Sequence, residues 1–164
     1  MIVFYGGETC GCGNPGCLEA YASRVAIERD IRAAVRSGRP SVVSDLIQST
    51  GKNRITSGIL AQALEQEDAV VSEVMDKVAT YLATLVATIV NFFDPEMIVV
   101  GGGVTEALGE RLVKPIREQA VQWFIQKKDA DKVRVVPAEL GDYAIVLGGA
   151  TIAWERLAAK NSKT

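Results

Sequence analysis

Apolar residues recur at three- and four-residue steps from Leu18 to Val35, which is the spacing of one face of an α-helix. The pattern ends at the Gly/Pro exit signal of residues 37–40, so it predicts one continuous helix from Leu18 to about Ser37. The run "MIVFY" at residues 1–5 is apolar and β-prone, and it predicts a strand that the following glycines end.

Two shorter periodic segments predict further helices over residues 42–48 and 57–66, with a polar loop at 49–56 between them. Asp68 is placed to cap a long helix that ends near Asp94. Small side chains form a stripe along this helix, which would let a neighbouring element approach closely. The stripe consists of Ala79, Ala83 and Ala87.

Apolar runs in the second half predict the strands of a parallel sheet. Met97–Val100 is fully apolar, as expected for a strand covered on both faces, and another strand is expected within residues 132–140. After the first strand come a glycine turn and a helix capped by Thr105 that runs to about residue 126, started anew or kinked at Pro115. Alternating strands and helices indicate an α/β fold. The turn consists of Gly101, Gly102 and Gly103.

The last helix is expected within residues 141–160 and contains Gly148 and Gly149. A glycine destabilises a helix interior by about 1 kcal/mol relative to alanine. These two glycines therefore predict a close contact with a neighbouring backbone.

The composition is that of one globular domain. The chain has 164 residues, of which 48% are hydrophobic and 23% charged. Eighteen Lys and Arg oppose twenty Asp and Glu, a net charge of −2, and the basic residues form no cluster beyond Lys127-Lys128. Phosphate backbones need a concentrated basic surface, so the chain predicts no nucleic-acid partner.

No membrane partner is predicted either. The uncharged run at residues 78–93 is shorter than the about 20 apolar residues of a membrane span and is interrupted by threonines, so it predicts a buried helix. The N-terminal residues lack the basic start and the long apolar run of a signal peptide, which predicts a cytoplasmic protein.

All three cysteines lie in the segment "CGCGNPGC", as Cys10, Cys12 and Cys17. Clustered cysteines in a cytosolic protein favour a metal site over disulfides, and thiolates are typical zinc ligands. The alternatives are three free thiols, or one disulfide and a spare thiol. The sequence contains no histidine, so the chain offers neither an imidazole as a fourth zinc ligand nor a Ser-His or Cys-His catalytic pair.

The segment "CGCGNPGCLEAYAS" resembles the zinc-loop signature C-x-C-G-x-x-G-C-x-E of the ROK family, which comprises repressors and sugar kinases such as bacterial glucokinases. Every fixed position of the signature is present, from Cys10 to Glu19. The segments "NFFDPEMIVVGGGV" and "LGDYAIVLGGATIA" resemble later parts of the family, so the likeness covers nearly the whole chain. It matches only the C-terminal half of a typical member.

The resemblance implies a fold and a domain organisation. It implies the C-terminal domain of an actin-like (ribonuclease H-like) sugar kinase fold, with residues 1–164 as a single domain and the N-terminal phosphate lobe outside the chain. The family's histidine ligand to zinc would fall immediately before Met1, so we expect the chain to be a piece of a longer protein.

The resemblance also implies what this chain lacks for catalysis. The family's catalytic aspartate and its D-x-G-x-T phosphate loop belong to the other lobe, and the sequence contains no D-x-G-x-T. Asp94 and Asp142 do not fit that role. No catalytic residue is therefore predicted here, and ATP and Mg²⁺ would act only in the full-length protein.

By the same resemblance, Glu19 accepts hydrogen bonds from sugar hydroxyls, and the turn Gly101–Gly103 lies at the nucleotide. From the residues alone, Glu19 could instead be an acid in the first turn of a helix, and the glycines could form an ordinary strand-to-helix turn.

Three functions stay open: part of a hexose kinase that is inactive alone, the sugar-sensing domain of a ROK-type repressor, or an unrelated zinc module for interactions. A small-molecule sugar is the expected ligand. A homo-oligomer, such as a dimer, is the expected assembly.

Overall fold

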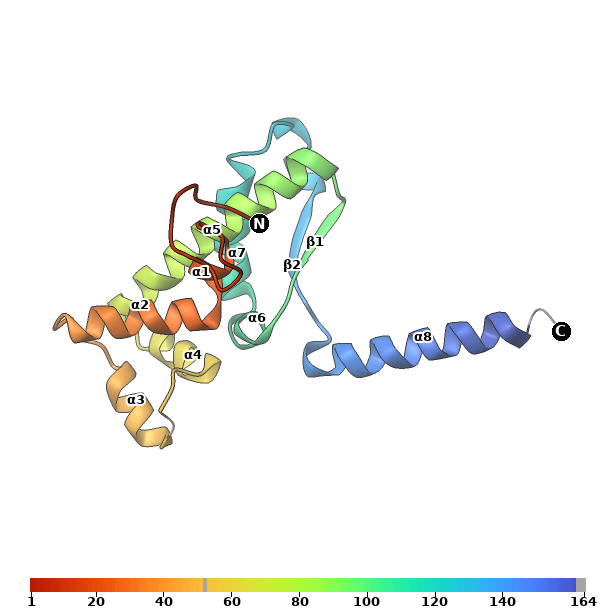
Figure 1. Cartoon of the computed structure of the whole chain (residues 1–164). Helices are drawn as coiled ribbons and strands as arrows, with labels where there is room; N and C mark the ends of the chain where they lie inside the picture. Colours follow the sequence, from red (N-terminus) through yellow and green to blue (C-terminus); the bar gives the residue numbers. More distant parts are fainter. Residues whose placement is uncertain (52, 162–164) are drawn as a thin grey trace.

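The computed structural model describes residues 1–51 and 53–161 (Figure 1). Helices dominate, and two short strands form the sheet. The elements are α1 (Glu19–Ala22), α2 (Arg24–Arg36), α3 (Val43–Thr50), α4 (Ser57–Glu65), α5 (Ala69–Phe93), β1 (Met97–Val100), α6 (Gly103–Leu108), α7 (Glu110–Val121), η1 (Lys127–Lys132), β2 (Arg134–Pro137), η2 (Gly141–Tyr143) and α8 (Ala144–Asn161). The two short helices expected in the first half, the long helix and both strands are thereby confirmed.

Helix α5 is the centre of the core, with α2 and α7 packed against it. Its stripe of small side chains is buried, as expected, and consists of Ala79, Ala83 and Ala87. Asp68 begins the helix as predicted: its carboxylate accepts hydrogen bonds from the backbone N–H of Val71 at 2.9 Å and of Val42 at 2.7 Å. Asp68 therefore joins the start of α5 to the start of α3.

The strand predicted at residues 1–5 is wrong. Ile2 makes a single isolated antiparallel bridge to Cys17, and the carbonyl of Met1 accepts a hydrogen bond from the N–H of Leu18 at 2.9 Å. The segment runs beside the end of the cysteine loop, which offers too little extended backbone for a ladder. The first residues thus support the cysteine loop.

The continuous helix predicted from Leu18 is also wrong, because Ser23 divides it into α1 and α2. Ser23 is extended, with φ −71° and ψ 155°, and its hydroxyl accepts a hydrogen bond from the N–H of Ala26 at 3.2 Å. A serine that caps the following turn competes with helix continuation. The break makes Arg24 the first residue of α2.

The helix after β1 is likewise divided, at Gly109, whose φ of 52° and ψ of −128° lie outside the helical region. Thr105 lies inside α6, where its hydroxyl donates to the carbonyl of Gly101 at 3.4 Å, so it is not the cap. Pro115 lies within α7 and neither starts nor ends it. The predicted positions of the cap and of the break are therefore corrected.

The sheet is parallel, as predicted, with β1 paired to β2 in the register Ile98 to Val135. The strand β1 is not covered on both faces: Met97 and Val99 are 42% and 56% exposed. Helix α7 packs on β2, and Val135 is buried. One face of the sheet is therefore open in this chain.

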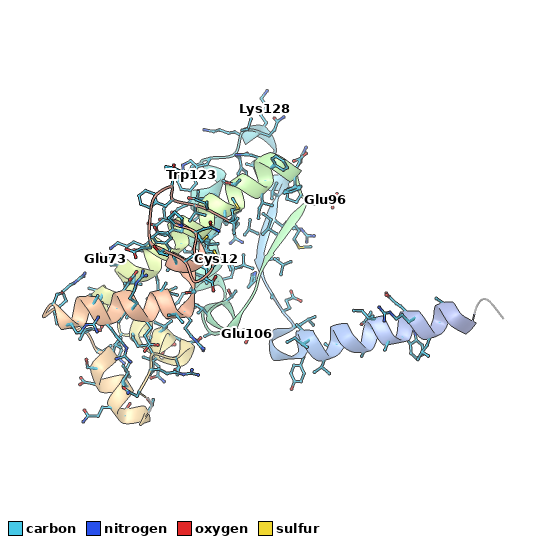
Figure 2. All side chains as sticks on the ribbon, viewed as in Figure 1. Cys12, Glu73, Glu96, Glu106, Trp123 and Lys128 are labelled. Carbon is cyan, nitrogen blue, oxygen red and sulfur yellow. The ribbon has the colours of Figure 1, made fainter. Side chains whose placement is uncertain are left out.

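Helix α8 projects from the body of the chain (Figure 1), and its side chains stand apart from the other elements (Figure 2). Ile145 and Trp154 are 88% and 75% exposed. A β-carbon added at Gly148 or Gly149 would meet no atom within 4 Å, so the predicted close contact is not made within the described residues. Among the helices described, none is both long and apolar enough to cross a membrane.

Candidate functional site

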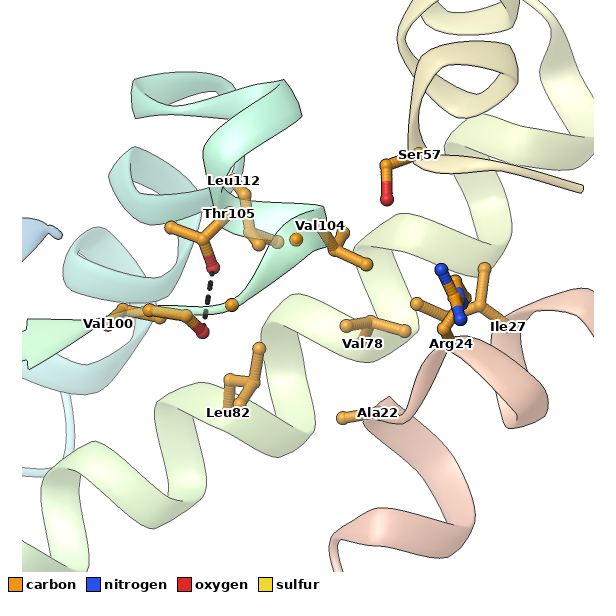
Figure 3. Close-up of a pocket in the computed structure, with 13 residues that line it drawn as sticks. Ala22, Arg24, Ile27, Ser57, Val78, Leu82, Val100, Val104, Thr105 and Leu112 are labelled. Carbon is orange, nitrogen blue, oxygen red and sulfur yellow. Dashed lines mark hydrogen bonds between the residues drawn. The ribbon is translucent and has the colours of Figure 1, made fainter. Parts of the chain in front are cut away.

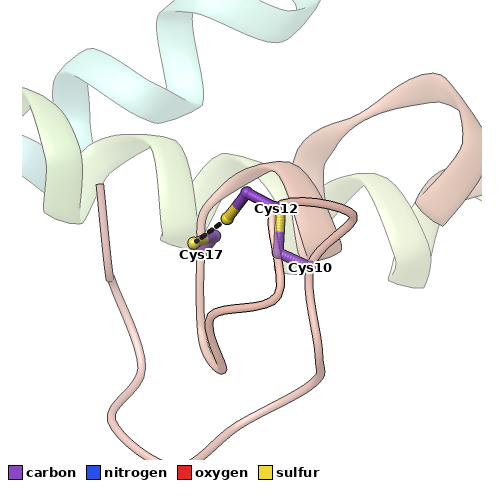
Figure 4. A group of neighbouring side chains, drawn as sticks. All are labelled: Cys10, Cys12 and Cys17. Atoms are coloured by element: carbon purple, nitrogen blue, oxygen red, sulfur yellow. Dashed lines mark hydrogen bonds between the residues drawn. The ribbon is translucent and has the colours of Figure 1, made fainter.

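The cysteine loop gathers three sulfur atoms at one point. The Sγ atoms of Cys10, Cys12 and Cys17 all lie within 4.8 Å of one another, as free thiols (Figure 4). Cys12 and Cys17 are 3.7 Å apart. Thiolates bound tetrahedrally to zinc at about 2.3 Å would be about 3.8 Å apart, so this spacing fits zinc ligation. The disulfide alternative finds no support in the structure.

Backbone hydrogen bonds and two glycines shape the loop. The N–H of Cys10 donates to the carbonyl of Asn14, and the N–H of Gly13 to the carbonyl of Cys10, both at 2.9 Å. Gly13 and Gly16 have φ values of 89° and 80°. A β-carbon at Gly16 would lie 1.7 Å from the carbonyl oxygen of Phe4, so only glycine fits there.

The surroundings of Cys12 and Cys17 shift the pKa values of their thiols in opposite directions. A backbone hydrogen bond at Asn14, followed by hydrogen bonds with the Cys10 and Cys17 thiols, lowers the pKa of Cys12 to about 7. Burial, followed by hydrogen bonds with the Cys12 and Cys10 thiols, raises the pKa of Cys17 to about 11. The loop thus favours a thiolate at Cys12 over one at Cys17, and a bound cation would favour the ionised form of both thiols.

The three cysteine sulfurs can fill three of the four coordination positions of a zinc ion. Three sulfur ligands from one tight loop are typical of a structural zinc site. Because the chain has no histidine, the fourth ligand is not an imidazole of these residues.

Glu19 lies beside this loop. The Cys10 thiol donates to its carboxylate at 3.5 Å, between Sγ and Oε2. Glu19 also lines a cavity of about 380 Å³ whose wall includes Thr9, Arg24 and Arg29. It begins α1, which has only four residues, so little helix dipole is available to explain an acid there.

The glycine turn lines a second, larger cavity of about 460 Å³ (Figure 3). Gly102 has a φ of 108° and begins α6 as its cap, a conformation that favours glycine. Apolar side chains from α5 and β1, such as Leu82 and Val100, form much of the wall, together with Ser57. The turn therefore offers exposed backbone at the edge of an apolar cavity.

Sequence reasoning missed Arg24 and Ser57, the first residues of α2 and α4. Arg24 lines both cavities and so stands between Glu19 and the glycine turn. The only local signal was Ser23, a residue type that favours a helix start. The predicted cysteines come together with Glu19, whereas the glycine turn lines the neighbouring cavity.

The small parallel sheet and its glycine turn, set among helices, form an α/β arrangement that solved sugar kinases share. A solved glucokinase from Streptomyces griseus, in complex with glucose and AMPPNP, superposes with a TM-score of 0.77 and 30% identity, over 93% of this chain and 49% of that one. A ROK hexokinase from Thermus thermophilus gives a TM-score of 0.70 at 29% identity, over 97% of this chain and 47% of that one. The predicted fold class is confirmed.

The profile of the ROK family matches residues 1–156, and the chain belongs to that family. The predicted resemblance is therefore confirmed, and an unrelated zinc module is excluded.

Both branches of the family are among the relatives. The glucokinase of Thermotoga maritima is 36% identical over 96% of this chain and 48% of its own length. The Escherichia coli regulator NagC is 31% identical over 87% of this chain and 32% of its own length. The chain thus spans about half of the similar kinase and a third of the similar regulator.

Proposed function

We propose that residues 1–164 form the C-terminal, sugar-binding and zinc-binding domain of an ATP-dependent hexose kinase. Membership of the ROK family and the glucokinase relatives support this proposal. The observation that carries it is the 3.5 Å contact between the Cys10 thiol and the Glu19 carboxylate, because it couples a metal loop to the acid beside a cavity.

In this proposal Cys10, Cys12 and Cys17 hold a zinc ion that fixes the loop. The ion is structural and supplies rigidity. The fixed loop sets the position of Glu19, which then accepts hydrogen bonds from the hydroxyl groups of a hexose. A carboxylate suits this role because charge-assisted hydrogen bonds are stronger than neutral ones.

The nucleotide is assigned to the cavity at Gly101–Gly103, with ATP and Mg²⁺ acting in the full-length protein. No catalytic residue is assigned to this chain. Phosphoryl transfer needs a group that orients or deprotonates the attacking hydroxyl. Asp94 terminates α5 and is exposed, and the side chain of Asp142 lies outside the part that the structure describes. The chain alone is therefore expected to be inactive.

Calorimetric titration of glucose into the zinc-loaded chain tests the proposal. We expect measurable binding, lost in E19A. An equal affinity of the parent chain and E19A would contradict the role of Glu19. ATP-dependent hexose phosphorylation by the chain alone would contradict the absence of a catalytic base.

A second candidate is the sugar-sensing domain of a ROK-type repressor. The similarity to the regulator NagC favours it. Reading the coding sequence upstream of Met1 discriminates the two. A D-x-G-x-T motif supports the kinase, and a helix-turn-helix segment supports the repressor.

The partner assignments follow from the same proposal. We assign a small-molecule sugar and a homo-oligomeric assembly to this domain, and neither a nucleic acid nor a membrane. The net charge of −2 supports the lack of a nucleic-acid contact. A cytoplasmic location stays a prediction.

A further inference from the structure

Arg24 occupies a position between the two cavities. It lines the larger cavity with the glycine turn and the smaller cavity with Glu19. Figure 3 shows its side chain beside Ile27, on the side of the view opposite Val100 and Thr105. A group bound by Arg24 would therefore lie between the proposed nucleotide and sugar positions.

The Arg24 guanidinium is available to a ligand. The residues that the structure describes give it no hydrogen bond and no ion pair, and it is exposed. Arg29, which lines the smaller cavity, is by contrast engaged: it pairs with Asp30 at 2.7 Å and donates to the carbonyl of Ala20 at 3.2 Å. Of the two arginines at the smaller cavity, Arg24 is the one that can bind an anion.

The larger cavity favours an anion at Arg24. Among its described wall residues Arg24 is the one charged side chain, and the rest are mostly apolar residues and glycines. The wall therefore offers no carboxylate that would compete with an anion for Arg24. Arg24 and Ser57 also begin α2 and α4, so the first-turn N–H groups that Ser23 and Thr56 do not cap add positive potential at the cavity wall.

We propose that Arg24 binds a phosphate group of the ligand that occupies the larger cavity. The planar guanidinium matches the geometry of phosphate oxygens and can bind two at once. The volume of about 460 Å³ is that of a typical small-molecule site. This inference rests on the proposed function and adds a positioning and specificity residue to it. The phosphate can belong to a nucleotide or to a phosphorylated hexose.

Calorimetric titration of the purified full chain with adenosine, ADP and glucose 6-phosphate tests the inference. The variants are R24Q, R24K and the matched control R36Q, which removes the same charge from the last turn of the same helix. We expect R24Q to weaken ADP binding about tenfold, as for the loss of a charge-assisted hydrogen bond. Adenosine should bind the parent chain and R24Q equally, R24K should recover part of the ADP affinity, and R36Q should match the parent chain.

The outcomes separate the inference from the function on which it rests. A weakening confined to glucose 6-phosphate would support the phosphate site and assign it to the sugar. Parent-like binding of both phosphorylated ligands by R24Q would overturn the Arg24 inference alone, and so would an equal loss of adenosine affinity. If the parent chain bound neither adenosine nor ADP nor glucose 6-phosphate, the proposed nucleotide cavity would fail as well.

Discussion

The Cys10 thiol lies 3.5 Å from the Glu19 carboxylate, although the two are nine positions apart in the sequence. The cysteine loop turns back on itself between them, through Gly13 and Gly16. Glu19 therefore lies against the loop and also lines the smaller cavity. The cysteine loop and the proposed sugar site are thus one structural unit.

The loop geometry predicts that an alanine lowers zinc affinity at Gly16 but not at Gly11. In G16A the new methyl group would collide with the Phe4 carbonyl, from which a β-carbon lies 1.7 Å, at a φ of 80°. We expect G16A to lower zinc affinity at least tenfold, measured by competition with a chromogenic chelator. The control is G11A, because a β-carbon at Gly11 meets no atom within 4 Å. Parent-like zinc affinity in G16A would show that the loop adapts without glycine.

A substitution at Glu19 can separate the effect of its charge on sugar binding from the effect of its shape. We expect E19Q, which keeps the shape of the side chain, to weaken glucose binding about tenfold, because a neutral amide accepts hydrogen bonds less strongly than a carboxylate. Zinc content, measured by elemental analysis, should not change. The control is E106Q, since Glu106 lines neither cavity. Loss of zinc in E19Q would instead assign Glu19 to the metal.

Asp68, which lines neither cavity, predicts an effect on stability. D68A should lower the free energy of unfolding by about 2 kcal/mol, because two backbone amides, of Val71 and Val42, lose their buried acceptor. Chemical denaturation measures this. The control D76A removes an exposed carboxylate from the same helix and should change stability by less than about 0.5 kcal/mol. Equal effects of the two substitutions would contradict the capping role.

The same residue predicts how stability depends on pH. Burial of the Asp68 carboxyl opposes its ionisation, but hydrogen bonds from Val71, Ser41 and Val42 outweigh burial and lower its pKa. A lowered folded-state pKa contributes stability above the ordinary pKa of aspartate, about 3.9, and this contribution is lost as the pH falls below it. Denaturation curves from pH 7 to acid should show a smaller acid-induced loss in D68A than in the parent chain. Parallel pH profiles would contradict this linkage.

The exposed apolar helix α8 predicts self-association. A helix that is apolar around its circumference is normally buried, and Ile152 and Leu157 are 52% and 61% exposed here. We expect sedimentation velocity to detect oligomers of the chain at micromolar concentration. The double substitution I152E/L157E should dissociate them, whereas Q48E, which adds a charge on α3, should not. A monomeric parent chain would contradict the predicted oligomer.

Local signals in the sequence predicted the elements that local forces determine. Asp68 was recognisable as a cap because it immediately precedes a long apolar helix, and β1 because four apolar residues lie between a Pro-containing turn and glycines. Ser23 was missed because the helical spacing of apolar residues continues across it. The strand at residues 1–5 was wrong because β-propensity alone supplies no partner strand.

The candidate site was predictable only in part. The cysteine signature identified the loop and Glu19, since both lie within one short segment. The convergence of Arg24 with Ser57 and the glycine turn depends on how α2, α4 and β1 pack, which no local pattern contains. The sequence also could not predict the open sheet face or the exposed surface of α8. An apolar residue gives the same sequence pattern whether other residues of this chain cover it or leave it exposed.

X-ray absorption spectroscopy at the zinc edge, on the chain purified without chelators, tests the central claim most directly. The account predicts one zinc ion per chain with three sulfur neighbours at about 2.3 Å, and their loss in a variant with Cys10, Cys12 and Cys17 all replaced by serine. A chain that binds no zinc, or zinc surrounded only by oxygen and nitrogen, would contradict it.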